Sequence, residues 1–118
     1  PADLSLPPAR EGSEDVARRV AFARNIQLER YQKLNEEFGT NIKTNAEADG
    51  EILERVTKLD QKSNDLLVGA SEKLKLSARG YHRILRVART LADLAGQDSI
   101  SHIHIGEALS YRRITFGR

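Results

Sequence analysis

The chain has 118 residues, a formal net charge of +2, and neither cysteine nor methionine. This length suits one domain with its own core rather than two, and the lack of cysteine excludes disulfides, thiolate metal sites and cysteine nucleophiles. No apolar run approaches the roughly 18 residues that span a membrane, and no signal-peptide pattern opens the chain, so we expect a cytoplasmic protein without membrane contact. Because the chain begins with Pro1 and lacks Met, we interpret it as a piece of a longer protein.

The first predicted elements are a linker and a long helix. Residues 1–12 contain all three prolines and no helical periodicity, which predicts an extended linker entering the domain. Ser13 is followed by acidic residues and predicts the N-cap of a helix over 14–37, which Gly39 ends. The stripe expected to face the core consists of Val16, Val20, Ala23, Gln27, Tyr31, Leu34 and Phe38, with Phe22 and Ile26 beside it.

Two shorter helices follow a turn-rich segment. Residues 39–48 predict an ordered loop or short turn, after which Asp49 opens a helix that ends near Leu59. Asp60 then caps a helix over 61–75. The inward residues are expected to be Ile52, Leu53 and Val56 in the first helix, and Leu66, Leu67, Ala70 and Leu74 in the second.

The last two predicted helices complete the fold. Ser77 caps a helix over 78–95 that Gly96 ends, and Ser101 caps a final helix. The inward residues are expected to be Tyr81, Ile84, Leu85, Ala88, Leu91, Ala92 and Ala95, followed by Ile103, Ile105, Ala108, Leu109 and Tyr111. Since no run alternates with period two, we expect no sheet.

The predicted fold class is therefore all-α, a compact bundle of about five helices. We expect the helical domain to occupy residues 13–113 and a C-terminal tail to occupy 114–118.

Enzyme motifs are mostly absent from the sequence. There is no glycine-rich phosphate loop, no Cys–His cluster and no His-Glu-x-x-His pair. His102 and His104 fall on different sides of a helix, and we interpret them as partly exposed residues near a helix start. His104 with Glu107 makes a pair of ligands at most, which is too few for a zinc site, so we expect no metal site.

The helix over 78–95 is the strongest functional candidate, because it carries four arginines. Between Lys73 and Arg89 the chain has six Lys or Arg residues and no Asp or Glu, whereas residues 47–60 have five acids. Ser77 places Arg79 in the first helical turn, where the helix dipole disfavours a cation but favours a bound phosphate. Arg79, Arg83 and Arg86 share one face, with Arg89 and His82 alongside.

Three interpretations of these arginines remain open from spacing alone. The first is a solvated basic face opposite the core stripe. The second is nucleic-acid binding, in which arginines neutralise backbone phosphates. The third is one arginine that contacts a nucleotide phosphate, while its neighbours support it or bind another subunit.

At this point the chain resembles a known family. The run SARGYHRILRVARTLADL at 77–94 closely resembles the C-terminal helical segment of magnesium chelatase-related AAA+ ATPases, in particular the YifB/ComM-like competence proteins. The run HIGEALSYR at 104–112 resembles the closing helix of the same family. Further matches in the correct order are Val20, Ala23, Arg24, Gln27, Arg30 and the Asn-Ala loop at Thr44, Asn45 and Ala46.

The resemblance implies a function for part of a larger protein. In that family this region is the helical lid that follows a nucleotide-binding α/β core. The core would precede Pro1 and would contain the loops that bind ATP and Mg²⁺. The resemblance implies that Arg79 is the sensor-2-type arginine that reaches the γ-phosphate of ATP, with Arg83 and Arg86 as phosphate or subunit contacts. The implied partner is the AAA+ core of the same or a neighbouring subunit in a homo-oligomeric ring. The implied parent is an ATP-driven motor whose output stays open between DNA processing, with DNA as a further partner, and remodelling of another protein. The fragment alone is not expected to bind ATP or to hydrolyse it.

One residue departs from the family pattern, and two other functions remain open. Gly80 directly follows Arg79, where a better helix former would be expected, and it loosens the backbone beside this arginine. The alternative function is a DNA-binding helical module that uses the basic face of helix 78–95. A third interpretation is a subunit-contact domain without phosphate chemistry.

Overall fold

Helices account for nearly all of the described chain in this computed structural model, which describes the backbone of residues 2–115 and the side chains of residues 13–111. In chain order the elements are α1 (Ala2–Phe38), the 3-10 helix η1 (Asn45–Glu47), α2 (Gly50–Val56), α3 (Gln61–Leu74), α4 (Ala78–Leu94) and α5 (His102–Thr115). No strand occurs between residues 2 and 115; one parallel bridge joins Leu59 to Ile100. The predicted all-α class and five helices are confirmed.

Several predicted helix ends are confirmed by their hydrogen bonds. The Asp60 carboxylate accepts the Ser63 backbone N–H at 2.8 Å, and the Ser77 hydroxyl accepts the Gly80 N–H at 3.0 Å. Gly39 directly follows α1 with φ at +68°, a left-handed conformation that a residue with a Cβ adopts only with strain. These local signals define where the chain turns and fix the start of α4.

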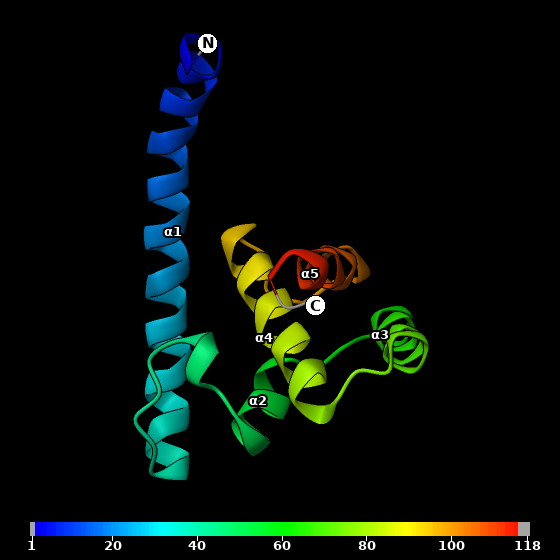
Figure 1. Cartoon of the computed structure of the whole chain (residues 1–118). Helices are drawn as coiled ribbons and strands as arrows, with labels where there is room; N and C mark the ends of the chain where they lie inside the picture. The colour runs from blue at the N-terminus through cyan, green and yellow to red at the C-terminus, as the bar shows by residue number, and fades with distance from the viewer. Residues whose placement is uncertain (1, 116–118) are drawn as a thin grey trace.

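Helix α4 lies at the centre of the domain (Figure 1). It packs against α1, η1 and α5, and α3 packs against the other side of α5. The core is formed by Tyr31, Ala48, Ile52, Leu53, Val56, Leu67, Ile84, Leu85, Ala88, Ala92, Ile100, Ile105 and Ala108. Most of the predicted inward residues of α2 and α4 are therefore confirmed as core.

The first half of α1 differs from the prediction. The helix begins at Ala2 rather than after Ser13, so the backbone of residues 2–12 is helical and not extended. Proline disfavours a helix interior because it donates no backbone hydrogen bond, but its φ, fixed near −65°, is a helical value, so the backbone can stay helical through positions 7 and 8. Val16 was expected in the core-facing stripe and Phe22 beside it, but they are 45% and 54% exposed because this half of α1 projects beyond the other helices (Figure 1).

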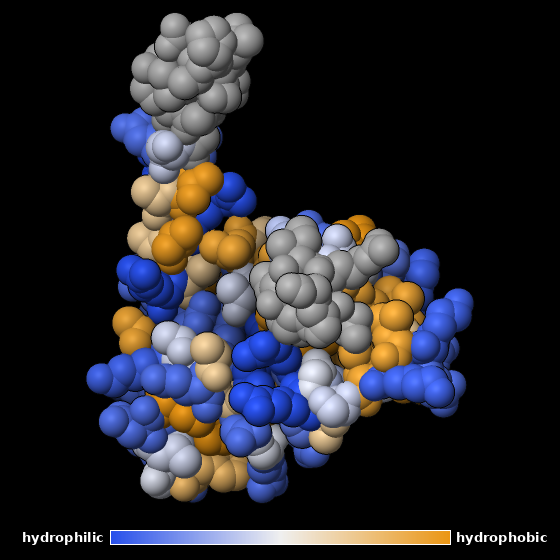
Figure 2. Space-filling model, in the orientation of Figure 1, coloured by the Kyte–Doolittle hydropathy of each residue, from blue (hydrophilic) through white to orange (hydrophobic). Residues whose placement is uncertain are grey.

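The prediction is also wrong for several residues of α3 and α5, and for one directly after α4, that were expected to face the core. Leu66 and Leu74 of α3 are 39% and 41% exposed, and Ile103 of α5 is 62% exposed. The same holds for Ala95 and Tyr111. α3 packs mainly against α5, so only a narrow stripe of it is covered. Figure 2 shows apolar side chains gathered over α3 and along the projecting half of α1.

The C-terminal boundary differs slightly from the sequence prediction. α5 continues to Thr115, so positions 114 and 115 are helical, and the remainder of the predicted tail lies outside the described residues. The domain limits of 13–113 stay a prediction. Among the described helices, none combines the length and the hydropathy that crossing a membrane requires.

Candidate functional site

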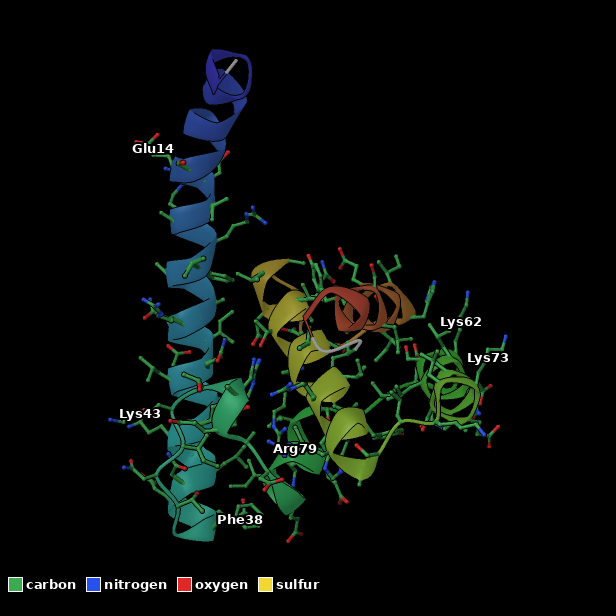
Figure 3. All side chains as sticks on the ribbon, viewed as in Figure 1. Glu14, Phe38, Lys43, Lys62, Lys73 and Arg79 are labelled. Atoms are coloured by element: carbon green, nitrogen blue, oxygen red, sulfur yellow. The ribbon has the colours of Figure 1, made fainter. Side chains whose placement is uncertain are left out.

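Arg79 lies in the first turn of α4, two residues after the Ser77 cap (Figure 3). Its side chain is exposed and forms no hydrogen bond or ion pair with the described residues 13–111. The first N–H groups of a helix have no intrahelical acceptor, and their partial positive charge adds to that of the guanidinium. The start of α4 is therefore an exposed, positively charged point on a fixed backbone.

Gly80 is not required by the local packing. A Cβ built at this position would lie 3.5 Å from the Ser77 hydroxyl and 3.8 Å from the nearest Leu76 side-chain carbon, which are ordinary contacts. Its φ lies outside the positive range. The glycine therefore reduces helix propensity beside Arg79 without relieving a steric clash.

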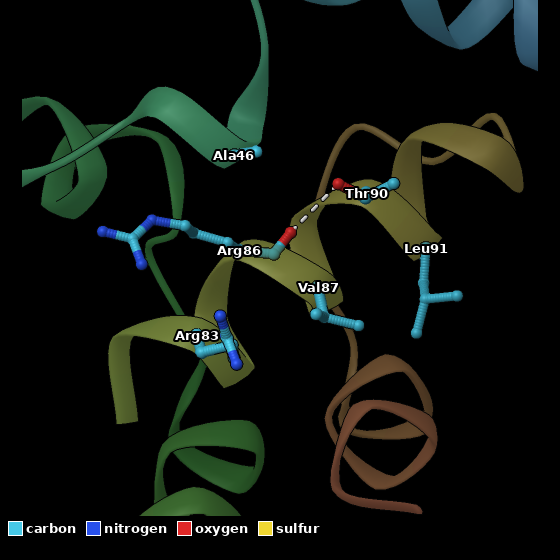
Figure 4. A pocket seen from close by; sticks show the side chains of 6 residues that line it. All are labelled: Ala46, Arg83, Arg86, Val87, Thr90 and Leu91. Atoms are coloured by element: carbon cyan, nitrogen blue, oxygen red, sulfur yellow. Dashed lines mark hydrogen bonds between the residues drawn. The ribbon is translucent and has the colours of Figure 1, made fainter. Parts of the chain in front are cut away.

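Arg83 and Arg86 are brought together at one end of a cavity of about 310 Å³ (Figure 4). Arg83 is exposed, whereas the side chain of Arg86 is only 22% exposed. Arg86 donates from Nε to the Ala48 carbonyl at 2.7 Å and forms an ion pair with Asp49 at 3.3 Å. Arg86 is thus already engaged in linking α4 to the segment before α2, and its predicted phosphate role stays a prediction.

Arg89 does not belong to an exposed basic face, which corrects the prediction for the four arginines. It is only 5% exposed, and its guanidinium donates to the carbonyls of Val56 at 3.3 Å and Gln97 at 3.0 Å. It also forms an ion pair with Asp93 at 3.2 Å. Because its side chain reaches inward, Arg89 ties the end of α2 to the α4–α5 connection and is shielded from an external phosphate.

A buried polar network joins α1, η1 and α4. Asp93 is 1% exposed and accepts two hydrogen bonds from Arg30, at 2.7 and 2.9 Å. The side-chain amide nitrogen of Asn45 donates to Asp93 at 2.9 Å and to Thr90 at 3.0 Å, while the Tyr31 hydroxyl donates to the side-chain Oδ1 of Asn45 at 2.6 Å. A bidentate arginine–carboxylate pair of this kind fixes both partners in one orientation. The network therefore holds the second half of α4 against α1.

Burial and charge shift the pKa values of the groups in this network. Burial disfavours the charge of Arg30, but the hydrogen bonds and the negative charge of Asp93 outweigh this effect and raise the pKa of Arg30. Burial lowers the pKa of Arg89, and the nearby Arg30 adds to that effect against the opposing attraction of Asp93. Burial also raises the pKa of the Tyr31 hydroxyl. Asp93 thus pairs with two guanidinium groups whose pKa values shift in opposite directions, upward for Arg30 and downward for Arg89.

His104 makes a structural contact at the start of α5. The Nδ1 atom of His104 accepts the Ser101 backbone N–H at 3.0 Å, which satisfies a donor at the start of α5. His104 is 7% exposed, so the prediction of partial exposure is wrong for this residue. Within the described part of the chain, no group of three or more His, Cys, Asp or Glu side chains is placed to hold a metal ion.

Sequence reasoning missed the role of Asp93 and treated Asn45 only as part of a loop. Asp93 is the first acid after a basic run and follows Arg89 by four residues, a spacing that favours an ion pair on a helix. That signal could have indicated that Arg89 has a partner. The bond to Arg30 spans 63 positions and could not be inferred from local spacing.

Comparisons of the sequence with known proteins identify a family and several relatives. Residues 10–112 match the family described as magnesium chelatase, subunit ChlI C-terminal. The chain is 42% identical over 102 residues to competence protein ComM of Haemophilus influenzae, and 38% identical over 104 residues to the uncharacterized protein YifB of Escherichia coli. It is 36% identical over 103 residues to the uncharacterized protein Mb2921c of Mycobacterium bovis. These matches cover 86–88% of this chain but only 18–19% of each relative.

Proposed function

The chain belongs to the magnesium chelatase, subunit ChlI C-terminal family, and from this premise we propose that it is the helical lid of a larger AAA+ ATPase. In this proposal Arg79 contacts the γ-phosphate of ATP as a sensor-2-type arginine. The remainder of the longer protein supplies the nucleotide-binding core, including the groups that hold Mg²⁺. The chain on its own binds no nucleotide and catalyses no reaction.

The observation that carries the proposal is the difference between Arg79 and the arginines behind it. Arg86 and Arg89 are held by carbonyl and carboxylate groups of the same chain, whereas Arg79 makes no such contact within residues 13–111. An exposed guanidinium at a capped helix start fits the oxygens of a phosphate group, which accept charge-assisted hydrogen bonds. Phosphoryl transfer needs fixed positive charge where negative charge develops, and the Ser77 cap fixes the backbone from which Arg79 extends.

The buried network supports the same proposal from the other end of α4. Arg30, Asn45 and Asp93 hold the second half of the helix against α1, so the helix moves with the domain as one body. A lid of this kind would carry the Arg79 side chain toward or away from the nucleotide when the domain rotates. Arg83 is the next exposed arginine on this face, and in the proposal it contacts a phosphate or a neighbouring subunit of a ring.

The proposal is tested by Arg79→Ala in the purified full-length protein. Loss of a preorganised donor to a developing phosphate charge is expected to lower ATP turnover by about 10²–10³-fold. Arg79→Lys keeps the charge but loses the planar fork, so it should fall between the wild type and the alanine variant. Lys62→Ala removes an exposed cation of α3 and serves as the matched control, with turnover unchanged.

The outcomes separate the alternatives. Normal ATP turnover together with normal nucleotide-dependent assembly of Arg79→Ala would refute the proposal. Normal ATP affinity and turnover with impaired assembly would instead identify a subunit-contact domain without phosphate chemistry. Turnover should be measured at saturating ATP, so that weaker binding alone does not account for the loss.

A further inference from the structure

Two open surface hollows lie along a partly exposed face of α4, at the edge of the core, against which Val87 and Leu91 also pack. The first, of about 310 Å³, is lined by Ala46, Arg83, Arg86, Val87, Thr90 and Leu91. The second, of about 450 Å³, is lined by Arg18, Arg19, Phe22, Leu94, Ala95 and Gly96. Within α4, positions 83, 87, 90, 91 and 94 follow helical spacing and share one side of the helix. The two cavities are therefore aligned along one surface, which we call the α4 groove.

The floor of the α4 groove is apolar. Val87, Leu91 and Leu94 are each partly exposed, and they follow one another along the helix at steps of four and three residues. Beside Leu94, the exposed aromatic ring of Phe22 reaches across from α1 to within 4.0 Å of the position that a Cβ on Gly96 would take. An exposed aromatic residue next to an apolar floor is typical of an anchor in a protein interface.

Arginine residues stand at both ends of this floor. Arg83 and Arg86 lie at one end, and Arg18 and Arg19 lie at the other. None of the described residues that line the two cavities is acidic. Arg18 already has Asp15 as an ion-pair partner, whereas Arg19 is exposed. The charges therefore complement a partner that is negative at its ends and apolar between them.

The dimensions suit a short helix. From Arg83 to Leu94 the α4 backbone rises about 16 Å, at ~1.5 Å per residue, so a partner helix of about three turns covers the floor. Amphipathic helices bind in grooves of this kind through apolar residues at positions i, i+3 or i+4, and i+7. The relatives are about five times longer than the part of them that this chain matches, which leaves ample sequence for such a helix.

We propose that the α4 groove binds an amphipathic helix with an acidic residue at each end, contributed by the longer protein outside these 118 residues. Val87, Leu91 and Leu94 contact its apolar stripe, and Phe22 anchors one end. Arg83, as a protein contact rather than a phosphate contact, and Arg19 pair with its terminal carboxylates. The role is independent of Arg79, since the groove begins one helical turn beyond that residue and requires no nucleotide.

The experiment is photo-crosslinking in the purified full-length protein. Leu94→p-benzoylphenylalanine places the reactive group in the groove, and Val68→p-benzoylphenylalanine on α3 is the control, since Val68 is 39% exposed and lines neither cavity. The Leu94 variant is expected to give one dominant crosslinked peptide from outside residues 1–118, identified by mass spectrometry. That peptide should have an apolar stripe at helical spacing between acidic residues.

Two further variants test the basis of the contact. Phe22→Ala removes an exposed ring and should lower the crosslink yield by about tenfold without changing the unfolding midpoint. Arg19→Glu combined with Arg83→Glu should lower the yield similarly, because both ends would then repel the partner. Restoration of the yield by exchanging the two partner acids for lysine would support the pairing.

Several results would overturn the proposal. These are a Leu94 yield no higher than that of Val68, a crosslinked peptide without acidic ends, or a crosslink to a second copy of this domain. Crosslinking to an added single-stranded oligonucleotide in place of the peptide would also overturn it. Loss of ATP turnover in Arg79→Ala with an unchanged crosslink would leave the groove intact, so failure of one proposal is distinguishable from failure of the other.

Discussion

The two ends of α4 use the same residue type for different purposes. At the second half of the helix, Arg89 is buried among carbonyl and carboxylate groups and helps to hold three segments together. At the first turn, Arg79 is exposed and has no partner within residues 13–111. Helical spacing in the sequence does not distinguish Arg79 from Arg89. The difference arises from Asp93 and from the Val56 and Gln97 carbonyls, which supply partners at one end of the helix only.

The largest expected effect on stability comes from removing Asp93, the carboxylate that pairs with Arg89 at the second half of α4. Asp93→Ala leaves Arg30 and Arg89 with buried positive charge and no carboxylate, so the free energy of unfolding should fall by about 3–5 kcal/mol. Urea denaturation of the protein measures this change. Arg79→Ala should lie within about 0.5 kcal/mol of wild type in the same assay, because it breaks no internal contact. Similar losses of unfolding free energy in both variants would contradict the claim that Asp93 stabilises the fold whereas Arg79 makes no internal contact.

A smaller effect, on the pH dependence of stability, distinguishes the Asp60 cap of α3 from the Ser77 cap of α4. Hydrogen bonding from Ser63 lowers the pKa of Asp60, whose carboxylate accepts the Ser63 backbone N–H. The folded state therefore binds this proton less tightly than the unfolded state does. Its contribution is complete above the ordinary aspartate pKa of about 3.9 and is lost as the pH falls through the lower pKa of the folded state.

Asp60→Asn keeps a good capping side chain but removes this titration. We expect the unfolding free energy of the variant to depend less steeply on pH than that of wild type between about pH 5 and pH 2. Ser77→Ala should weaken α4 by the same amount at every pH, because serine does not titrate. Identical pH slopes for wild type and Asp60→Asn would show that this cap contributes nothing to acid sensitivity.

The smallest expected effect concerns Gly80 beside Arg79. Gly80→Ala should raise the free energy of unfolding by up to about 1 kcal/mol, because alanine is the better helix former and the added Cβ meets only ordinary contacts. ATP turnover of the full-length protein should be unchanged if Arg79 needs only a fixed helix start. Reduced ATP turnover of the stabilised Gly80→Ala variant would mean instead that ATP hydrolysis requires a flexible backbone at Gly80.

Much of the fold could be predicted because its signals are local. Asp60, Ser77, Gly39 and Gly96 mark helix ends through hydrogen bonds and backbone conformations that involve only neighbouring residues. The inward face of α4 followed from helical periodicity for the same reason. The projecting half of α1 was mispredicted because periodicity indicates which residues share a face but not whether another element covers that face.

The candidate site was predictable only in part. The position of Arg79 at a capped helix start follows from Ser77, and the structure confirms that cap. The contacts of buried Arg89 depend on Val56, which lies 33 positions earlier in the sequence, and on the path of the α4–α5 connection, which carries Gln97. Such long-range pairings leave no local pattern, so four arginines on one helix appeared equivalent.

The central claim is that Arg79 contacts the γ-phosphate, and its most direct test compares two nucleotides. In the purified full-length protein, the Kd of a non-hydrolysable ATP analogue and the Kd of ADP are measured for wild type and Arg79→Ala. The account predicts that the variant binds the ATP analogue about tenfold or more weakly, the loss of one charge-assisted contact, while its affinity for ADP is unchanged. Equal affinities of variant and wild type for both nucleotides, or an equal loss for both, would contradict it.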